Sequence, residues 1–72
     1  MASSYQIAKA RSIAGTLVRA AAESDTPMSQ LATLAARMTH QQWVSVSLNA
    51  GVPVAEERCR VLVIAFLERL AA

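Results

Sequence analysis

Residues 31–49 read LATLAARMTHQQWVSVSLN and contain two short segments with helical hydrophobic spacing. The first segment ends near Arg37, and the second begins after Thr39. Thr39 followed three residues later by Gln42 is a capping-box pattern, in which the two side chains satisfy free amides at the start of a helix. The pattern predicts a corner at residues 37–39 between two helices. The alternative is one straight helix with Thr39 in its interior.

The second segment, residues 40–50, carries two competing patterns. The cap before it and the sequence NAG at 49–51 suit a helix that ends on a left-handed glycine, and Pro53 blocks any continuation. The sequence WVSVSL at 43–48 alternates apolar and polar residues, which is the period of a strand. Valine and tryptophan also favour strands. We expect the helix.

A longer helix is predicted over residues 4–23, where Ser3 and Gln6 form another capping pair. Its apolar stripe, spaced at three and four residues, consists of Ile7, Ala10, Ala14, Leu17 and Ala21, widened by Ile13 and Val18. The opposite, solvated side carries Lys9, Ser12, Thr16, Arg19 and Glu23. Gly15 lies in the middle of this helix, where glycine costs about 1 kcal/mol relative to alanine. We interpret it as the mark of a close helix crossing.

Two further helices complete the predicted fold. Thr26 and Pro27 are typical of a helix start, and the helix to Arg37 has one apolar face, made of Met28, Leu31, Ala32, Leu34, Ala35 and Met38. The last helix spans residues 53–70, with Glu56 and Glu57 in its first turn, where the helix dipole favours anions. Its core face is predicted to consist of Cys59, Leu62, Val63, Phe66 and Leu70.

The 72 residues are enough for one domain, residues 1–72, and the predicted fold class is all-α, a compact bundle of about four helices. A chain of this size buries only about 60% of its unfolded surface. With one cysteine and one histidine, it has no internal disulfide and too few ligands for a zinc cage. We expect no metal and no cofactor, and we expect self-association to add stability.

The last helix is the predicted homodimer contact, because its apolar surface extends too far round for one small monomer to cover. The dimer interface is assigned to Val61, Ile64 and Leu67, with Glu57, Arg60 and Glu68 at its edge. The alternative is a central helix that the other three helices surround.

Several function classes are excluded. The N-terminus lacks a secretion signal, and the longest apolar run, seven residues at 61–67, is far shorter than the about 20 that span a membrane. A cytoplasmic protein is expected. Nothing orients His40 or Cys59 as a nucleophile pair, so we expect no enzyme. His40 is interpreted as a partly buried structural residue beside Trp43 and Ser47, and Cys59 as a core thiol.

The positions around the corner resemble a helix-turn-helix at the second and third helices. Leu31 and Ala32 match the apolar and small residues of its first helix, and the small pair at 35–36 allows a close crossing. Met38 matches the plug in the turn, Thr39 caps the second helix, and Trp43 and Val46 would seat that helix. The segments VSVSLN at 44–49 and VAEERCRVL at 54–62 are similar to lac-repressor-type headpieces, and the helix before them is similar to lambda-repressor-like domains.

This resemblance, over residues 31–62, implies a sequence-specific DNA-binding transcriptional regulator that acts as a homodimer on double-stranded DNA. The DNA base contacts would be Gln41, Gln42, Ser45 and Asn49, whose side chains match base edges in the major groove. The phosphate contacts would be Arg37, Thr39, Lys9, Arg11 and Arg19, with Arg58 and Arg60 as further candidates. The net charge of +2 permits this function without requiring it. The alternative is a helical adaptor or inhibitor that binds another protein and no DNA.

Overall fold

The structure is a computed structural model that describes residues 3–52 and 57–72. Its helices are α1 (Ser4–Glu23), α2 (Met28–Arg37), α3 (His40–Asn49) and α4 (Glu57–Ala71). The described residues contain no strand, so the all-α prediction is confirmed, and the strand alternative for residues 43–48 is wrong. The predicted start of the last helix at Pro53, and Glu56 in its first turn, lie outside the described residues.

Two capping boxes set the starts of α1 and α3, as the sequence predicts. The Ser3 backbone N–H donates to Gln6 Oε1 and the Gln6 N–H donates to Ser3 Oγ, both at 3.2 Å. At the corner, the Thr39 N–H donates to Gln42 Oε1 at 2.9 Å, and the Gln42 N–H donates to Thr39 Oγ1 at 3.2 Å. Met38, with φ −57° and ψ 135°, leaves the helical region, so the corner replaces the straight-helix alternative.

The start of α2 differs from the prediction in its cap. Pro27 itself occupies the N-cap position, and no side chain caps the helix there. The Thr26 hydroxyl instead lies 2.9 Å from the Ser24 hydroxyl, so the two side chains hydrogen-bond within the link between α1 and α2. Asp25 adopts a positive φ of 56° in this link, which reverses the chain between the two helices.

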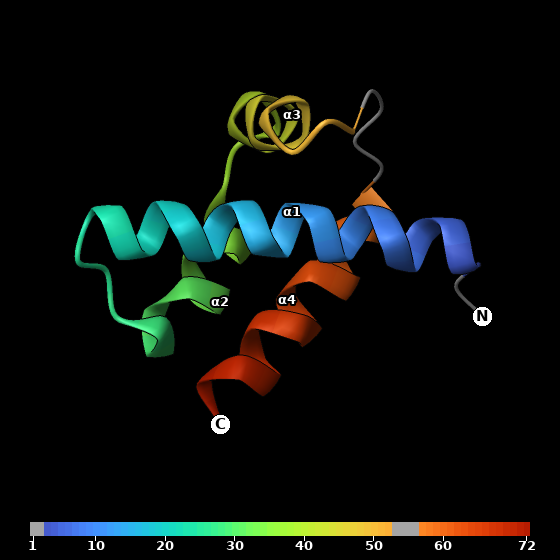
Figure 1. Cartoon of the computed structure of the whole chain (residues 1–72). Helices are drawn as coiled ribbons and strands as arrows, with labels where there is room; N and C mark the ends of the chain where they lie inside the picture. Colours follow the sequence, from blue (N-terminus) through green and yellow to red (C-terminus); the bar gives the residue numbers. More distant parts are fainter. Residues whose placement is uncertain (1–2, 53–56) are drawn as a thin grey trace.

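α1 crosses the whole molecule and separates the other helices into two groups (Figure 1). α2 and α4 pack against each other and against α1 on one side, whereas α3 packs against α1 on the other side. The fully buried core joins both groups, because it contains Ile13 from α1, Trp43 from α3, and Val63 from α4. α3 is therefore attached to the bundle by one face and leaves its opposite face outside.

The inward face of α4 is formed by residues spaced at four, namely Cys59, Val63 and Leu67, and all three are completely buried. Cys59 is thus a core thiol, as predicted. The sequence places Leu67 in the dimer interface, and that assignment is wrong because Leu67 is completely buried within the chain. Leu70 was assigned to the core and is 60% exposed, since it lies near the end of α4.

Val61 and Ile64 are the remaining residues of the predicted dimer interface. Val61 is 69% exposed, and Ile64 is half-buried against the core. Their role as a dimer contact stays a prediction. None of the helices in the described ranges is long and apolar enough to cross a membrane.

Candidate nucleic-acid interface

The outward face of α3 is built by the burial of its opposite face. Trp43 and Ser47 point into the core and are almost inaccessible to solvent. The side chains on the other face are all exposed, and they are Gln41, Gln42, Ser45, Leu48 and Asn49. All four predicted base-contact residues therefore share one exposed surface. Leu48, an exposed apolar side chain on the same surface, was not part of the prediction.

The end of α3 is held by local hydrogen bonds. The Ser47 hydroxyl donates to the Trp43 carbonyl at 2.8 Å, which satisfies a polar group that the core would otherwise leave unpaired. The Val52 N–H donates to the Ser47 carbonyl at 2.9 Å, and Gly51 reverses the chain with φ 79°. The predicted left-handed glycine after this helix is confirmed. Val52 itself is buried, so the chain after α3 is anchored in the core.

Arg60 of α4 holds the corner between α2 and α3. Its Nη1 donates to the carbonyls of Ala35 at 3.2 Å and Met38 at 2.7 Å, at the end of α2. The last carbonyls of a helix have no partners within the helix, and a cation there is favoured by the helix dipole. The Arg60 guanidinium carbon also lies 5.1 Å from the centre of the Trp43 ring. One side chain of α4 therefore fixes both α2 and α3.

Glu57 orients Arg60 from the other side. Arg60 Nε donates to Glu57 Oε2 at 2.9 Å, and Nη2 donates to Oε1 at 3.1 Å, which is a bidentate pair. The side chain of Arg60 is only 12% exposed. Its candidacy as a phosphate contact and its place at the edge of a dimer interface are therefore wrong, because its guanidinium is engaged inside the molecule.

His40 lies at the first turn of α3, exposed to solvent, with Nδ1 3.8 Å from Glu57 Oε1. Its predicted partly buried place beside Trp43 and Ser47 is wrong, because the first turn of α3 extends beyond the core. The hydrogen bond from Arg60 lowers the pKa of Glu57 below its usual range, and the charges of Arg60 and His40 act in the same direction.

A lowered pKa makes the contribution of Glu57 to stability depend on pH. Because the pKa is lower in the folded chain, the contribution is present above the usual carboxyl pKa and is lost as pH falls through the folded value. We expect Glu57→Gln to lower the unfolding midpoint above the usual carboxyl pKa, and the difference from the wild type to close as pH falls below that value. Thermal unfolding followed by circular dichroism across this range measures it.

Glu68→Gln, on the exposed side of α4, is the matched control and is expected to leave the pH profile unchanged. A difference between Glu57→Gln and the wild type that persists at low pH would show that the carboxylate charge does not support the Arg60 contacts.

The predicted phosphate residues do not all lie near α3. Lys9 was assigned to the solvated side of α1, and this is wrong, because it is 9% exposed and its Nζ lies 4.5 Å from the centre of the Tyr5 ring. Arg11 lies over the Phe66 ring of α4, at 5.8 Å from its centre, and so on the side of α1 that carries α4. Arg19 is exposed on α1, where its Nη2 donates to Thr16 Oγ1 at 3.4 Å.

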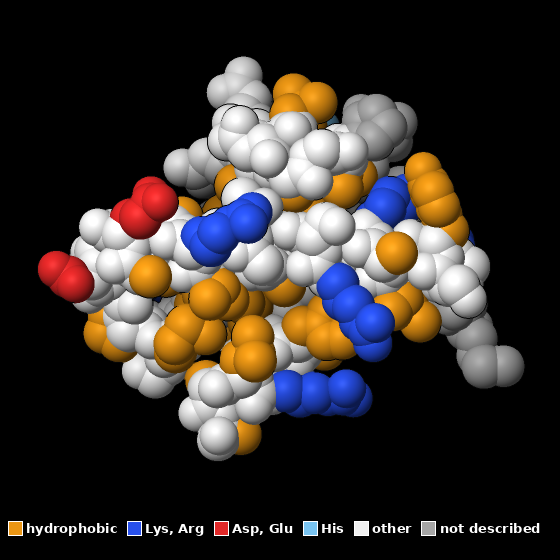
Figure 2. Space-filling model, in the orientation of Figure 1, with side chains coloured by type: hydrophobic (Ala, Val, Ile, Leu, Met, Phe, Trp, Pro, Cys, Tyr) orange, Lys and Arg blue, Asp and Glu red, His pale blue; other side chains and the backbone are white. Residues whose placement is uncertain are grey.

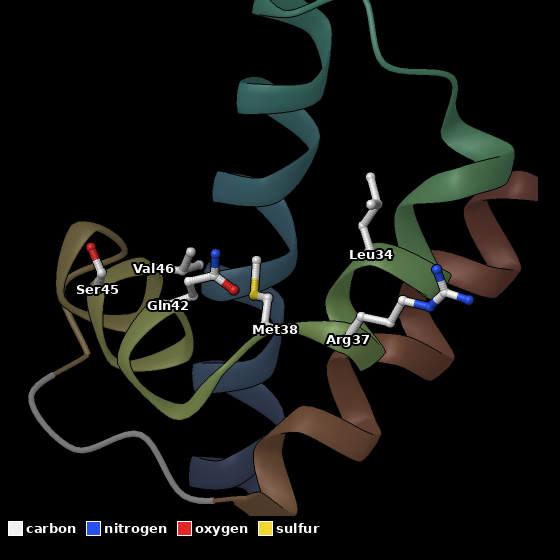
Figure 3. A pocket seen from close by; sticks show the side chains of 6 residues that line it. All are labelled: Leu34, Arg37, Met38, Gln42, Ser45 and Val46. Carbon is white, nitrogen blue, oxygen red and sulfur yellow. The ribbon is translucent and has the colours of Figure 1, made fainter.

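Thr39, another predicted phosphate residue, is the N-cap of α3, and Arg37 also lies beside this helix. Arg37 lines an open groove of about 440 Å³ between α2 and α3, together with Leu34, Met38, Gln42, Ser45 and Val46. Figure 3 shows Met38 between the two helices, with Leu34 and Arg37 on the α2 side and the other three side chains on the α3 side. Leu34, which belongs to the predicted apolar face of the second helix, is 47% exposed at this groove.

The groove occupies the place where a helix-turn-helix has its close helix crossing. α2 packs on α4 and α1, and Ala35 is buried there, whereas its neighbour Ala36 is exposed. Arg60 adds two hydrogen bonds between α4 and the end of α2 on this side. The helix-turn-helix at α2 and α3 is therefore not confirmed.

No protein-family model, curated protein or solved structure matches the chain. The predicted helix-turn-helix resemblance gains no support from relatives. Among the described residues, no three His, Cys, Asp or Glu side chains lie close enough together to hold a metal ion.

Proposed function

We propose that the protein is a small cytoplasmic transcriptional regulator that binds double-stranded DNA through the outward face of α3. The observation that carries this proposal is the exposure of Gln41, Gln42, Ser45 and Asn49 on one uncharged surface, opposite the buried face. Glutamine and asparagine pair bidentately with adenine in the major groove, and serine bonds to several base edges. A surface that hydrogen-bonds without a net charge suits base recognition better than phosphate binding.

The capping bonds divide the roles of these residues. Gln42 Oε1 already accepts the Thr39 N–H, so a bidentate contact from Gln42 to a base would share this oxygen with the cap. Gln41 and Asn49 have complete amide groups for bidentate pairing. Thr39 Oγ1 accepts the Gln42 N–H and keeps its own hydroxyl hydrogen for a phosphate oxygen, and Arg37 adds the charged phosphate contact near the corner.

A homodimer would double these few contacts and place two α3 helices on paired half-sites. The exposed Val61 and the half-buried Ile64 on α4 are the proposed contact. Arg58, exposed at the start of α4, is a further candidate for phosphate binding.

The test is fluorescence anisotropy with a labelled random-sequence duplex, at low and at moderate salt. We expect binding that weakens steeply as salt rises, because phosphate contacts release counterions. Arg37→Ala is expected to weaken binding and to reduce the salt slope by about 1. The matched control is Arg69→Ala, because both arginines are exposed in the last turn of a helix and only Arg37 lies beside α3. Absence of binding at low salt, or equal losses in both variants, would contradict the proposal.

A protein-binding adaptor is the second candidate, and the groove between α2 and α3 favours it. Leu34, Met38 and Val46 give this groove an apolar floor, and Arg37 and Gln42 give it a polar edge. Such a groove suits an amphipathic segment of a partner. The anisotropy test separates the two candidates, because an adaptor would show no salt-dependent binding to DNA.

A further inference from the structure

A second groove lies between α1 and α4. Its larger hollow has a volume of about 520 Å³, and its walls are Arg11, Ala14, Gly15, Val18, Phe66, Arg69 and Leu70. A smaller hollow of about 270 Å³ shares Arg11, Phe66 and Arg69 and extends the groove to Ile7. From Ile7 to Val18, α1 advances about 16 Å. On the face shown in Figure 2, hydrophobic side chains gather between α1 and α4, with Lys and Arg side chains beside them.

Gly15 has no internal reason to be glycine. A Cβ atom added at this position would meet no described atom within 4 Å. Gly51 has a positive φ, whereas Gly15 does not, so the backbone does not require glycine here either. The close helix crossing predicted at Gly15 is therefore absent from the described part of the chain. Glycine disfavours a helix interior, yet it lets another molecule approach the backbone closely. Gly15 therefore leaves the helix backbone in the wall of the groove open to another molecule.

The charges of the groove favour an anion. Arg11 and Arg69 line both hollows, and the residues that line them include no Asp or Glu. A guanidinium binds carboxylate and phosphate oxygens through two parallel N–H groups. A second copy of the chain is a poor occupant, because facing grooves would bring four arginines together without a carboxylate among the lining residues.

We propose that the groove between α1 and α4 binds a small amphipathic anion, in which a carboxylate or phosphate group carries an unbranched apolar tail. The anionic head lies between Arg11 and Arg69, and the tail follows Phe66 and Gly15 to Leu70. The volume of the larger hollow falls within the range of small-molecule sites, roughly 300–1,000 Å³. This site goes beyond the proposed DNA binding, and the only predicted phosphate residue that it uses is Arg11, which lies beside α4 and away from α3.

The first experiment is a titration of the whole chain, labelled with ¹⁵N, with dodecanoate below its micelle concentration. We expect saturable shifts of the Gly15 and Leu70 amide signals and unchanged signals from Ser45 and Asn49 of α3. Dodecyl phosphate is a second arm that distinguishes a phosphate head from a carboxylate head, and binding of either supports the site. Equal binding of dodecyltrimethylammonium, or of acetate, would overturn the proposal, as would no saturable shift with either anion.

Variants of the groove keep the proposal testable without unfolding the chain. Gly15→Ala is expected to raise the unfolding midpoint, because alanine favours a helix and its Cβ meets no neighbour. Gly15→Leu fills the hollow and is expected to raise the Kd for dodecanoate about tenfold or more. A Gly15→Leu variant that folds and binds dodecanoate as the wild type does would overturn the proposal.

The arginines give a matched pair for the same titration. Arg69→Ala is expected to weaken dodecanoate binding, whereas Arg37→Ala is the control and is expected to leave it unchanged. In the DNA experiment the two variants exchange roles, so failure of one proposal is distinguishable from failure of the other. Light scattering tests whether a second copy of the chain occupies the groove. A dimer that Gly15→Leu separates and Val61→Ser does not would place another chain in the groove and overturn the ligand proposal.

Discussion

Trp43→Ala is expected to lower the free energy of unfolding by about 3–5 kcal/mol, which is the usual cost of removing a buried aromatic side chain. Trp43 is 0% exposed and is the largest of the completely buried side chains. A core of this size supplies only roughly 3–5 kcal/mol in total. The variant is therefore expected to be largely unfolded at room temperature, with a loss of the helical signal and of a cooperative urea transition in circular dichroism.

Trp43→Phe separates volume from hydrogen bonding. The Trp43 indole N–H donates to no atom in the described part of the chain, so phenylalanine removes volume without leaving a broken hydrogen bond. We expect Trp43→Phe to remain folded and to lose less than half as much stability as Trp43→Ala. Equal losses in the two variants would contradict the view that Trp43 acts by filling the core.

Arg60→Ala is expected to cost about 2–3 kcal/mol, because hydrogen bonds to charged groups contribute more than neutral ones and two carbonyls would each lose a charged donor. Those carbonyls belong to Ala35 and Met38 at the end of α2, and the contact with the Trp43 ring would be lost as well. Urea unfolding measures the change. Arg58→Ala, an exposed arginine two residues away, is the matched control and is expected to change stability by less than about 0.5 kcal/mol.

Arg60→Lys tests the geometry of the same contacts. Lysine keeps the positive charge but has no planar fork, so it cannot reach the two carbonyls and both oxygens of Glu57 at once. We expect it to recover less than half of the lost stability. An Arg60→Ala variant as stable as Arg58→Ala would contradict the role of Arg60 at the corner between α2 and α3.

Arg60→Ala is also expected to reduce the protection of backbone amides from hydrogen exchange at the start of α3. Because Arg60 holds the corner, Arg60→Ala should expose the amides of Gln42 and Trp43 to faster exchange, while the amides of Ile13 and Ala14 in the buried middle of α1 stay protected. Under the proposed function, the same variant weakens DNA binding without itself contacting DNA. Its effect would then accompany a disordered corner, whereas Arg37→Ala would act with the corner intact.

The starts of α1 and α3 were predictable from the sequence because their determinants are local. Each capping box joins residues three positions apart, so the pattern S-x-x-Q or T-x-x-Q contains both hydrogen-bonding partners. The exposed polar face of α3 was predictable for a similar reason. Once Trp43 and Ser47 lie inward, the helical period places Gln41, Ser45 and Asn49 outward.

The environments of Leu67, Lys9 and Arg60 depended on neighbours that the sequence does not identify. Residues at three- and four-residue spacing on α4 were compatible with more than one inward face, and packing of α1 and α2 selected the one with Cys59, Val63 and Leu67. The charge and helical position of Lys9 predict a solvated side chain, but Lys9 is largely buried and packs on the Tyr5 ring. Nothing in the local pattern around Arg60 marks it as an internal donor except Glu57 three residues before it.

The sequence by itself determined the all-α class, the corner before Thr39 and the residues that share the outward face of α3, because helix caps and helical periodicity act within a few residues. Only the tertiary structure decided which surfaces of the helices meet. Arg60 bonds to carbonyls that lie 22 and 25 residues earlier in the chain, and these contacts join α2 to α4. Contacts at such separations depend on how all the helices pack together, and local spacing does not encode them.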